Sequence, residues 1–248
     1  DGIELPLNQS KLFQTVQSSL SNGQNIVTIL CYGTPVIDTF MFDTSDAILG
    51  SGYGGEMHGD AVVSLINGTN VPSGKTTITW YNNTRMLGNL SDYNMTSGYG
   101  KTYRYFNDTP IYSFGYGLSY TRFNYSDLKL SNANIKPCDS INVQFNVKNI
   151  GNTFTGDESS MVYLRILNNT YITTNIRLVN FTRNENIKPN GIISISLNIL
   201  PKWMTVIDPY YFNELIIPGQ YQVLIGGSMI MNNDRSYPGF LKSNFNII

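Results

Sequence analysis

The sequence predicts an α/β domain over residues 1–123 followed by an all-β sandwich over residues 124–248. Three observations lead to this prediction. The first part combines stripes of helical period with a continuous apolar run, as in layered α/β domains. The second part alternates apolar and polar residues with a period of two, as half-buried strands do. An aromatic-rich stretch, residues 101–123, separates the two patterns, so we place the domain junction there.

The chain opens with an expected helix over residues 10–21. It carries one apolar stripe with a four-residue spacing, formed by Leu12, Val16 and Leu20. Residues 25–31, NIVTILC, are then almost continuously apolar and rich in β-branched side chains. Such a run is typical of a parallel strand buried on both faces, so an α/β unit is expected to begin here.

Two more strands are expected at residues 47–49 and 76–80, with a helix between them. The helix begins near Met57, and residues 67–68, Asn-Gly, end it. Its apolar face is formed by Met57, Ala61 and Leu65. This order of elements is a piece of a layered α/β domain, too short to be complete. Residues 81–100 show little periodicity and are expected to form a long exposed loop.

The aromatic seam, residues 101–123, differs from an ordinary linker, because linkers are usually polar and rich in Gly, Ser or Pro. Large rings bury roughly 150–250 Å² each, so we expect these side chains to pack between the two domains. A short strand is expected near residues 111–113, and a turn at residues 115–117, where two glycines give backbone freedom. The aromatic residues are Tyr103, Tyr105, Phe106, Tyr112, Phe114, Tyr116, Tyr120 and Phe123.

Residues 124–248 contain about seven short strand patterns separated by turn signals, with no helical period. The clearest alternation runs over residues 141–147, 193–199 and 221–225. Such a series is typical of an immunoglobulin-like or fibronectin type III-like sandwich. The other expected strands lie at residues 128–130, 161–167, 176–181 and 239–247.

The surface is expected to be nearly neutral and rich in amides and hydroxyls. Charged residues make up 13% of the chain, about half the usual share, and the formal net charge is −1. With no long run of either sign, nothing favours nucleic acid or a membrane as partner, and no stretch approaches the length of a membrane span. No pattern indicates a cofactor. A surface of this kind suits sugars as ligands.

Nine Asn-X-Ser/Thr triplets occur, and a secretory pathway would treat them as glycan sites. They predict a secreted or lysosomal glycoprotein, although a chain rich in Asn, Ser and Thr also forms such triplets by chance. Asn107 is the weakest of them, because Pro110 follows its Thr109. The other eight begin at Asn8, Asn67, Asn82, Asn89, Asn94, Asn124, Asn168 and Asn180.

Residues 50–55, GSGYGG, fit the G-x-G-x-x-G template between an expected strand and an expected helix. The rest of the dinucleotide fingerprint is missing, because Lys75 rather than an acid lies about 20 residues further on. We favour close backbone approach to a ligand or to a neighbouring element. Glu56 would then lie at the start of the helix, where the helix dipole favours a carboxylate.

Other polar groups give weak evidence of chemistry. His58 is the only histidine, which excludes a multi-histidine metal site, and no metal is expected. The simplest interpretation of His58 is a polar residue in the first turn of a helix. Several acids could supply the paired carboxylates of glycoside hydrolysis, but capping or solvation explains most of them equally well. They are Asp38, Asp43, Asp46, Glu56, Asp60 and Asp92.

The two cysteines, Cys31 and Cys138, lie in different expected domains. A disulfide between them is therefore not expected. Cys31 ends an apolar run, so a buried thiol is expected there.

Three blocks in the same order resemble glycoside hydrolase family 3, in particular its β-xylosidase/α-L-arabinofuranosidase and β-glucosidase members. Residues 52–61, beginning GYGGE, are similar to the family's Gly-Tyr-Pro-Gly-Glu block. Residues 70–80, NVPSGKTTITW, resemble its Asn-Pro-Ser-Gly-Arg-Leu-Pro-Val-Thr-Trp. Residues 100–105, GKTYRY, and 110–121, PIYSFGYGLSYT, resemble Gly-Arg-Thr-Tyr-Arg-Tyr and Pro-Leu-Tyr-Pro-Phe-Gly-Tyr-Gly-Leu-Ser-Tyr-Thr, and this last block is the most specific.

The resemblance implies the later part of an α/β sandwich domain, which closes over the sugar site of an N-terminal catalytic barrel, followed by a fibronectin type III-like domain. It also implies hydrolysis of O-glycosyl bonds in an oligosaccharide or other glycoside from plants or microbes, by a retaining two-carboxylate mechanism. The family's aspartate nucleophile lies in the barrel, and its acid/base glutamate precedes the position of Asp1. Neither maps onto this chain, so the chain alone is expected to be inactive.

The resemblance places four residues of this chain near the substrate cleft, and the sequence departs from the family at three points. Gly54 stands where the family usually has Pro, Met57–His58 interrupts a Gly-Gly pair, and Lys101 replaces an Arg that could bind in a bidentate manner. The expected sugar contacts are Tyr53, Glu56, Asp92 and Arg104.

A second hypothesis comes from a different class of protein. A secreted carbohydrate-binding or matrix protein could have kept this scaffold without the chemistry. Because residue 1 is Asp rather than Met, we expect the start to be a processing point or an excerpt of a longer sequence. The upstream sequence would discriminate, since a barrel with an Asp nucleophile favours the hydrolase.

Overall fold

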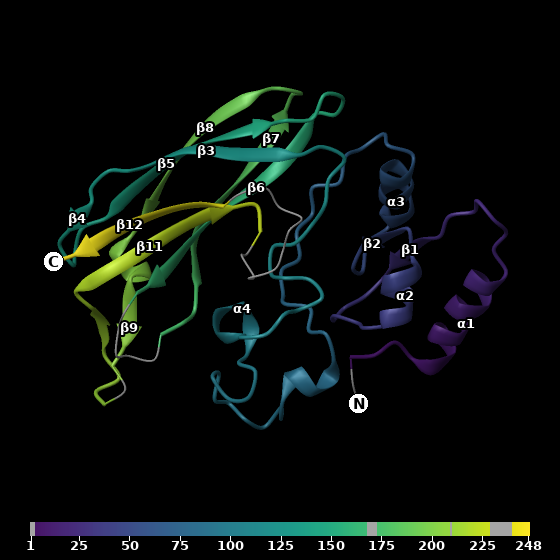
Figure 1. The fold of residues 1–248 in the computed structure, drawn as a ribbon, viewed down its shortest axis with the longest axis horizontal. Coiled ribbons are helices and arrows are strands. Elements are labelled where there is room, and N and C mark those ends of the chain that lie inside the picture. The colour runs from purple at the N-terminus through teal and green to yellow at the C-terminus, as the bar shows by residue number, and fades with distance from the viewer. Residues whose placement is uncertain (1–2, 168–172, 209, 229–239) are drawn as a thin grey trace.

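The computed structural model describes residues 3–167, 173–208, 210–228 and 240–248. It shows an α/β part joined to a β-sandwich, with the N-terminus on the α/β side and the C-terminus at the far end of the sandwich (Figure 1). The mixed α/β content that turns to mostly sheet confirms the predicted class. The α/β part contains α1 (Leu7–Ser18), β1 (Val27–Leu30), α2 (Thr39–Thr44), β2 (Ala47–Gly50), α3 (His58–Ile66), η1 (Thr84–Leu87) and α4 (Thr102–Tyr105).

Helix α1 begins three residues before the predicted start and ends at Ser18. The predicted apolar stripe does not face the core, since Leu12 is 65% and Val16 is 45% exposed. The helix instead contacts α2 through the rings of Phe13 and Phe40, whose centroids lie 6.0 Å apart. The spacing therefore predicted the helix correctly, but the prediction of its buried face was wrong.

Strands β1 and β2 pair in parallel, from Val27↔Ala47 to Leu30↔Gly50, as the apolar runs predict. The prediction that β1 is buried on both faces was wrong. Leu30 is buried, whereas Val27 and Ile29 on the other face are 48% and 42% exposed. The described residues cover that face only in part.

Helix α2 is missing from the sequence prediction because its six residues are too few to show a periodic stripe. Asp38 begins it. The Asp38 carboxylate accepts hydrogen bonds from the Met41 amide at 3.0 Å and from the Ser10 hydroxyl at 2.5 Å, which links α2 to α1.

We therefore expect Asp38→Ala to lower the free energy of unfolding by about 1 kcal/mol, the usual effect of losing an N-cap. Denaturant unfolding measures it. Asp38→Asn is the matched control, because an Asn side-chain oxygen also caps. A loss as large for Asn as for Ala would show that capping is not the role of Asp38.

Helix α3 ends as predicted, with Gly68 at φ +77° and its amide bonded to the Leu65 carbonyl at 3.1 Å. The face of α3 that packs against the rest of the protein is rotated relative to the predicted apolar face. Met57 is 65% exposed and Ala61 is exposed, whereas Val62 and Leu65 are half-buried. No α3 residue is fully buried.

The strand predicted at residues 76–80 is wrong. Only one isolated antiparallel bridge forms, between Trp80 and Tyr112. Trp80 exchanges backbone hydrogen bonds with Ile111 and Tyr112, and Thr76 exchanges them with Gly115 and Tyr116. Between these two contacts the segment 111–116 bends at Gly115, whose φ is +81°, so no continuous strand forms. The predicted turn is present at this point, since the Tyr116 amide donates to the Ser113 carbonyl at 3.1 Å.

The sandwich consists of a three-stranded sheet in the order β3-β5-β8 and a five-stranded sheet in the order β4-β12-β11-β6-β7. Each of the seven predicted strands corresponds to one of the longer strands, although Gly239 lies outside the described residues. The short β4, β9 and β10 were missed, because two or three residues cannot show alternation. The strands are β3 (Phe123–Leu130), β4 (Asn134–Ile135), β5 (Ile141–Asn149), β6 (Gly156–Ile166), β7 (Arg177–Ile187), β8 (Ile192–Ile199), β9 (Thr205–Ile207), β10 (Glu214–Ile216), β11 (Gly219–Gly226) and β12 (Leu241–Ile247), with η2 (Pro201–Trp203) before β9.

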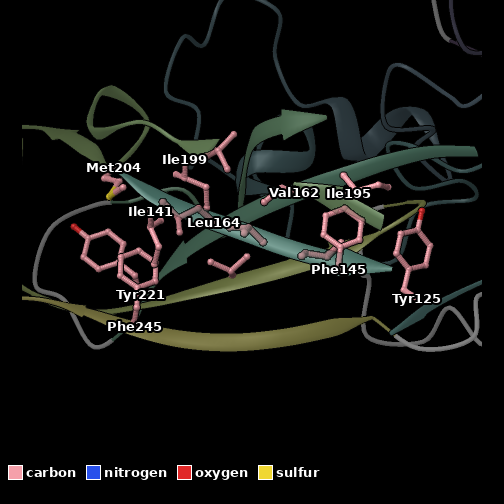
Figure 2. Close-up of a cluster of buried hydrophobic side chains, with 14 of the residues drawn as sticks. Tyr125, Ile141, Phe145, Val162, Leu164, Ile195, Ile199, Met204, Tyr221 and Phe245 are labelled. Atoms are coloured by element: carbon pink, nitrogen blue, oxygen red, sulfur yellow. The ribbon is translucent and has the colours of Figure 1, made fainter. Parts of the chain in front are cut away.

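The main hydrophobic core lies between these two sheets (Figure 2). Strand β5 alternates buried and partly exposed residues along its length, as period two requires. The labelled core residues come from both sheets and from the turn after η2: Tyr125, Ile141, Phe145, Val162, Leu164, Ile195, Ile199, Met204, Tyr221 and Phe245.

The aromatic seam contacts both parts of the molecule, as predicted. Tyr112 packs edge-on against the buried Trp80 at 5.8 Å, and Trp80 contacts Tyr32 beside β1 at 5.0 Å. On the sandwich side, Tyr103 stacks on Phe114 at 4.3 Å and meets Tyr163 of β6 at 6.5 Å. The seam thus joins the two parts through ring contacts.

A buried ion pair also crosses this junction. Lys75 Nζ lies 3.3 Å from Glu158 Oε2, with side-chain exposures of 9% and 2%. Lys75 also donates to the Gly117 carbonyl at 3.0 Å, and the Tyr125 hydroxyl donates to Glu158 at 2.9 Å. The pair therefore connects the segment before Trp80, the seam and the sandwich.

Both cysteines are free, as predicted, and both are exposed. The buried thiol expected at Cys31 was wrong. Cys31 directly follows β1, where the chain leaves the sheet, and its Sγ lies 3.6 Å from the Ser51 hydroxyl.

Candidate functional site

The carboxyl ends of β1 and β2 define the candidate site. Leu30 and Gly50 form the last pair of the parallel ladder, so residues 31–37 and 51–57 leave the sheet at the same edge. In open α/β sheets, ligands bind outside the carboxyl ends of the strands. Two of the predicted sugar contacts, Tyr53 and Glu56, lie on the second of these loops.

Close packing of tyrosine rings on glycines holds the two loops together. A Cβ added to Gly33 would lie 2.7 Å from Tyr53 Cε2, and one added to Gly50 would lie 3.2 Å from Tyr32 Cε1. The glycine-rich loop therefore serves close approach to a neighbouring element, one of the two interpretations we favoured for it. Tyr32 was missing from the predicted site. Its place directly after a parallel strand was the available signal.

His58 lies under the same loop. Its ring covers Gly54, where an added Cβ would come within 3.0 Å of His58 Cβ and Cγ. His58 Nε2 is buried and has no hydrogen-bond partner among the described residues. His58 is the first residue of α3, so the sequence interpretation of its position is confirmed.

Tyr53 and Glu56 present polar groups to solvent above this support. The Tyr53 side chain is 82% exposed although one edge of its ring packs on Gly33, and Glu56 is exposed. Glu56 forms no salt bridge with any described residue. A ring fixed at one edge and a carboxylate nearby can stack on a sugar and accept hydrogen bonds from its hydroxyls.

Asp92 and Arg104 lie elsewhere. The Asp92 carboxylate accepts from the Asn94 amide at 2.9 Å, and hydrogen bonds from Ser97 and this amide lower the Asp92 pKa. Arg104 lies on α4, beside the sandwich (Figure 1), where its carbonyl accepts from the Asn175 amide at 2.7 Å. Neither contacts the loops after β1 and β2 through a hydrogen bond in the described residues. Their assignment to the substrate cleft stays a prediction.

The other acids of the first part have structural partners or face solvent. Asp38 caps α2, and Asp46 accepts from the Ile26 amide at 2.8 Å. Asp43 and Asp60 are exposed. No group of three potential metal ligands occurs within the described residues.

Most of the predicted glycan sites are exposed. In Asn67, Asn89 and Asn94 the side-chain oxygen accepts the amide two residues on, which leaves the nitrogen out of that hydrogen bond. Asn180 is half-buried, and its nitrogen donates to the Asn198 carbonyl at 2.9 Å. Asn168 lies outside the described residues. The exposed sites are Asn8, Asn67, Asn82, Asn89, Asn94 and Asn124.

Comparison with known proteins decides the family. Residues 1–120 match the model of the glycosyl hydrolase family 3 C-terminal domain. Residues 1–120 belong to glycoside hydrolase family 3. The chain is 29% identical over 228 residues to a xylan 1,4-beta-xylosidase of Xylanibacter ruminicola, covering 92% of this chain and 25% of the relative. It is 30% identical over 182 residues to a beta-glucosidase of Kluyveromyces marxianus, covering 68% of this chain and 20% of the relative.

Solved family 3 structures extend the likeness to the sandwich. Beta-glucosidase 3B of Thermotoga neapolitana, in complex with glucose, aligns with a TM-score of 0.82 at 26% identity. The alignment covers 99% of this chain and 34% of that one. The chain thus spans about a third or less of these family 3 proteins.

Two departures from the family 3 pattern are coupled in space. A residue with a Cβ at position 54, such as the usual Pro, would collide with the His58 ring. Glycine at position 54 therefore fits the position of the His58 ring, since any larger residue there would meet that ring.

Proposed function

We propose that this chain is the C-terminal portion of a secreted or lysosomal glycoside hydrolase that acts on β-xylosides or β-glucosides. The observation that carries the proposal is the match of the whole chain, at 99% coverage, to a third of a beta-glucosidase of known structure. Hydrolysis then depends on an N-terminal barrel that carries the aspartate nucleophile, together with an acid/base glutamate that precedes the position of Asp1, for a retaining two-carboxylate mechanism. No cofactor takes part.

Exposed apolar faces support a covering partner. Leu12 and Val16 of α1, and Val27 and Ile29 of β1, are between 42% and 65% exposed. Exposed apolar side chains that share a face, as Val27 and Ile29 do on β1, are costly to leave in water and commonly mark an interface. The remainder of the α/β sandwich domain and the barrel of the same enzyme are the partner we propose for them.

The β-sandwich we assign as a fibronectin type III-like domain. Its three-stranded sheet pairs β3, β5 and β8, while β7, β6, β11 and β12 form the main part of the other. Two antiparallel sheets over one core support this assignment. In the proposed enzyme the sandwich is an appendix that holds the α/β part through the aromatic seam.

We expect the purified 248-residue chain to show no turnover of aryl β-xylosides or aryl β-glucosides, because neither catalytic carboxylate of the family that the sequence resembles maps onto it. Initial-rate assays on material of verified intact mass measure this. Co-expression with the upstream part of the same enzyme is expected to restore turnover. Turnover by the chain alone would refute the proposal, and sugar binding without turnover by the complete protein would favour a non-catalytic carbohydrate-binding protein.

Substitution of Glu56 tests whether this residue lies in the substrate cleft. In the complete enzyme, Glu56→Ala is expected to lower kcat/KM about 10-fold, as the loss of a charged hydrogen bond to a sugar hydroxyl would. Asp60→Ala is the matched control, since Asp60 is an exposed acid in the first turn of the helix that follows Glu56. Equal kinetics for the Glu56 variant and wild type would remove Glu56 from the cleft.

Residence in a secretory or lysosomal compartment rests on the Asn-X-Ser/Thr triplets. We expect glycans on the exposed Asn67, Asn89 and Asn94 and none on Asn180, whose amide nitrogen is held by the Asn198 carbonyl. Mass spectrometry of native material before and after deglycosylation gives the occupancy.

A further inference from the structure

A pocket opens between α4 and the sandwich, apart from the loops after β1 and β2. Its volume is about 110 Å³, several times the roughly 10–15 Å³ that one water needs. Tyr105 of α4 forms one wall, Arg177 of β7 another, and Trp203 with β9 a third. The pocket therefore depends on the fold of both parts of the chain.

The lining combines aromatic faces with hydroxyls. Trp203 is 39% exposed and Tyr105 is half-buried, so both rings keep surface available to a ligand. Thr174 and Thr205 belong to the same lining, and the Thr205 hydroxyl donates to the Lys202 carbonyl at 3.1 Å. Aromatic faces stack on the apolar C–H face of a sugar ring, while hydroxyl groups bond to its edge.

Positive charge without an ionic partner distinguishes this pocket from a neutral sugar site. Among the described residues, neither Arg177 nor Arg104 forms a salt bridge. Arg177 Nη1 donates to the carbonyls of Trp203 and Thr205, both at 3.1 Å. The other donors of its guanidinium make no bond to a described residue, and Arg104 Nε is buried without one. Lys202 Nζ lies 5.2 Å from the centre of the Trp203 ring.

The electrostatics agree with this geometry. Burial lowers the pKa of Arg177, and the positive charge of Arg104 lowers it further, whereas Tyr105, Tyr103 and Glu214 raise it by smaller amounts. Two guanidinium groups close enough to repel each other are stabilised when an anion binds between or beside them.

Exposed aromatic residues follow the pocket along the chain. Ile207 lines the pocket and ends β9, and the same hairpin carries Tyr210, Tyr211 and Phe212, which are 77–85% exposed. The Asp208 carboxylate accepts from the amides of Tyr210 at 2.7 Å and Tyr211 at 3.1 Å, which holds these residues in place. Exposed rings in a fixed turn give further sugar units a stacking surface.

We propose that this pocket binds a uronate unit of an acidic oligosaccharide, with the sugar carboxylate on Arg177 and the ring against Trp203. Neighbouring sugar units of the same chain lie on the exposed rings of the hairpin. This site is independent of the proposed hydrolysis, because its lining contains no residue of the loops after β1 and β2 and needs no barrel.

The test compares two ligands that differ only at the carboxylate. Methyl β-D-glucuronide and methyl β-D-glucoside are titrated into the full chain, followed by NMR of the two tryptophan indole N–H signals. We expect the glucuronide to bind at least about 10-fold more tightly, as a charge-assisted bidentate contact allows. The Trp203 signal is expected to shift, while that of Trp80, which is only 4% exposed, stays fixed as an internal control.

Variants and a free anion complete the design. Arg177→Lys is expected to remove most of the preference for the acid, and Tyr211→Ala to weaken a short oligouronide but not the monosaccharide. Phe181→Ala, at an exposed ring that does not line the pocket, is expected to change neither. Inorganic phosphate is expected to bind more weakly than the glucuronide. Equal affinity for the two methyl glycosides, a shift at Trp80 only, or phosphate binding as tight as the glucuronide would each overturn the proposal. The wild-type comparison holds even if a variant fails to fold.

Discussion

Glu158→Gln is expected to lower the free energy of unfolding by about 3–5 kcal/mol, because it leaves the Lys75 ammonium buried without its charged partner. The carboxylate is only 2% exposed, and Lys75 Nζ lies 3.3 Å away. Water therefore cannot easily replace the lost partner. Guanidinium unfolding of the chain, followed by tryptophan fluorescence, measures the change.

The double variant Lys75→Met/Glu158→Gln is the matched control. It removes both charges, while the amide oxygen of the introduced glutamine can still accept from the Tyr125 hydroxyl, so it is expected to recover most of the lost stability. A single variant that loses less than about 1 kcal/mol would show that water or another group solvates Lys75.

The same pair predicts a dependence on pH. Burial lowers the pKa of Lys75, and Glu158 raises it, so the lysine pKa falls further in Glu158→Gln. A lysine whose folded pKa lies below its unfolded value binds fewer protons in the folded state, and the free energy of unfolding rises with pH between the two values. The stability that Glu158→Gln loses relative to wild type should therefore become smaller as the pH rises toward 10.5, the usual lysine pKa. The double variant should not show this recovery.

Gly117→Ala is the second large expected effect, with a loss of about 3 kcal/mol of stability. A Cβ at position 117 would come well within 3.0 Å of the Gly74 carbonyl oxygen, a backbone atom that cannot rotate away. The Gly117 carbonyl also accepts from Lys75, so relief of this clash would disturb the buried ion pair.

Gly74→Ala controls for the general effect of replacing a glycine at this contact, because its own Cβ would meet nothing within 4 Å. Its stability is expected to stay within about 1 kcal/mol of wild type. Calorimetry of both variants gives the comparison. If both alanine variants lose the same free energy of unfolding, backbone entropy rather than close packing explains why residue 117 is glycine.

The candidate site could be predicted only in part. Tyr53 and Glu56 share one short loop, so sequence alone keeps them together. Asp92 and Arg104 lie in segments whose course depends on long-range packing, and the structure places Arg104 beside the sandwich. The pocket at Arg177 and Trp203 has no sequence signature, because residues 105, 177 and 203 meet only after the chain has folded.

The sequence by itself determined the local features that depend on neighbours along the chain. The alternation in β5, the apolar run of β1 and the glycine that ends α3 all express spacing or backbone freedom within a few residues. The blocks in residues 52–121 also determined the family, since they hold its specific residues in order.

Only the tertiary structure decided which apolar faces are covered and which polar groups meet. Val27 and Leu12 match a buried pattern yet face solvent, because burial depends on whether another layer lies above them. Lys75 and Glu158 lie far apart in the sequence, and no local pattern pairs them. Their contact depends on the aromatic seam, which brings the sandwich against the α/β part and excludes water from the junction.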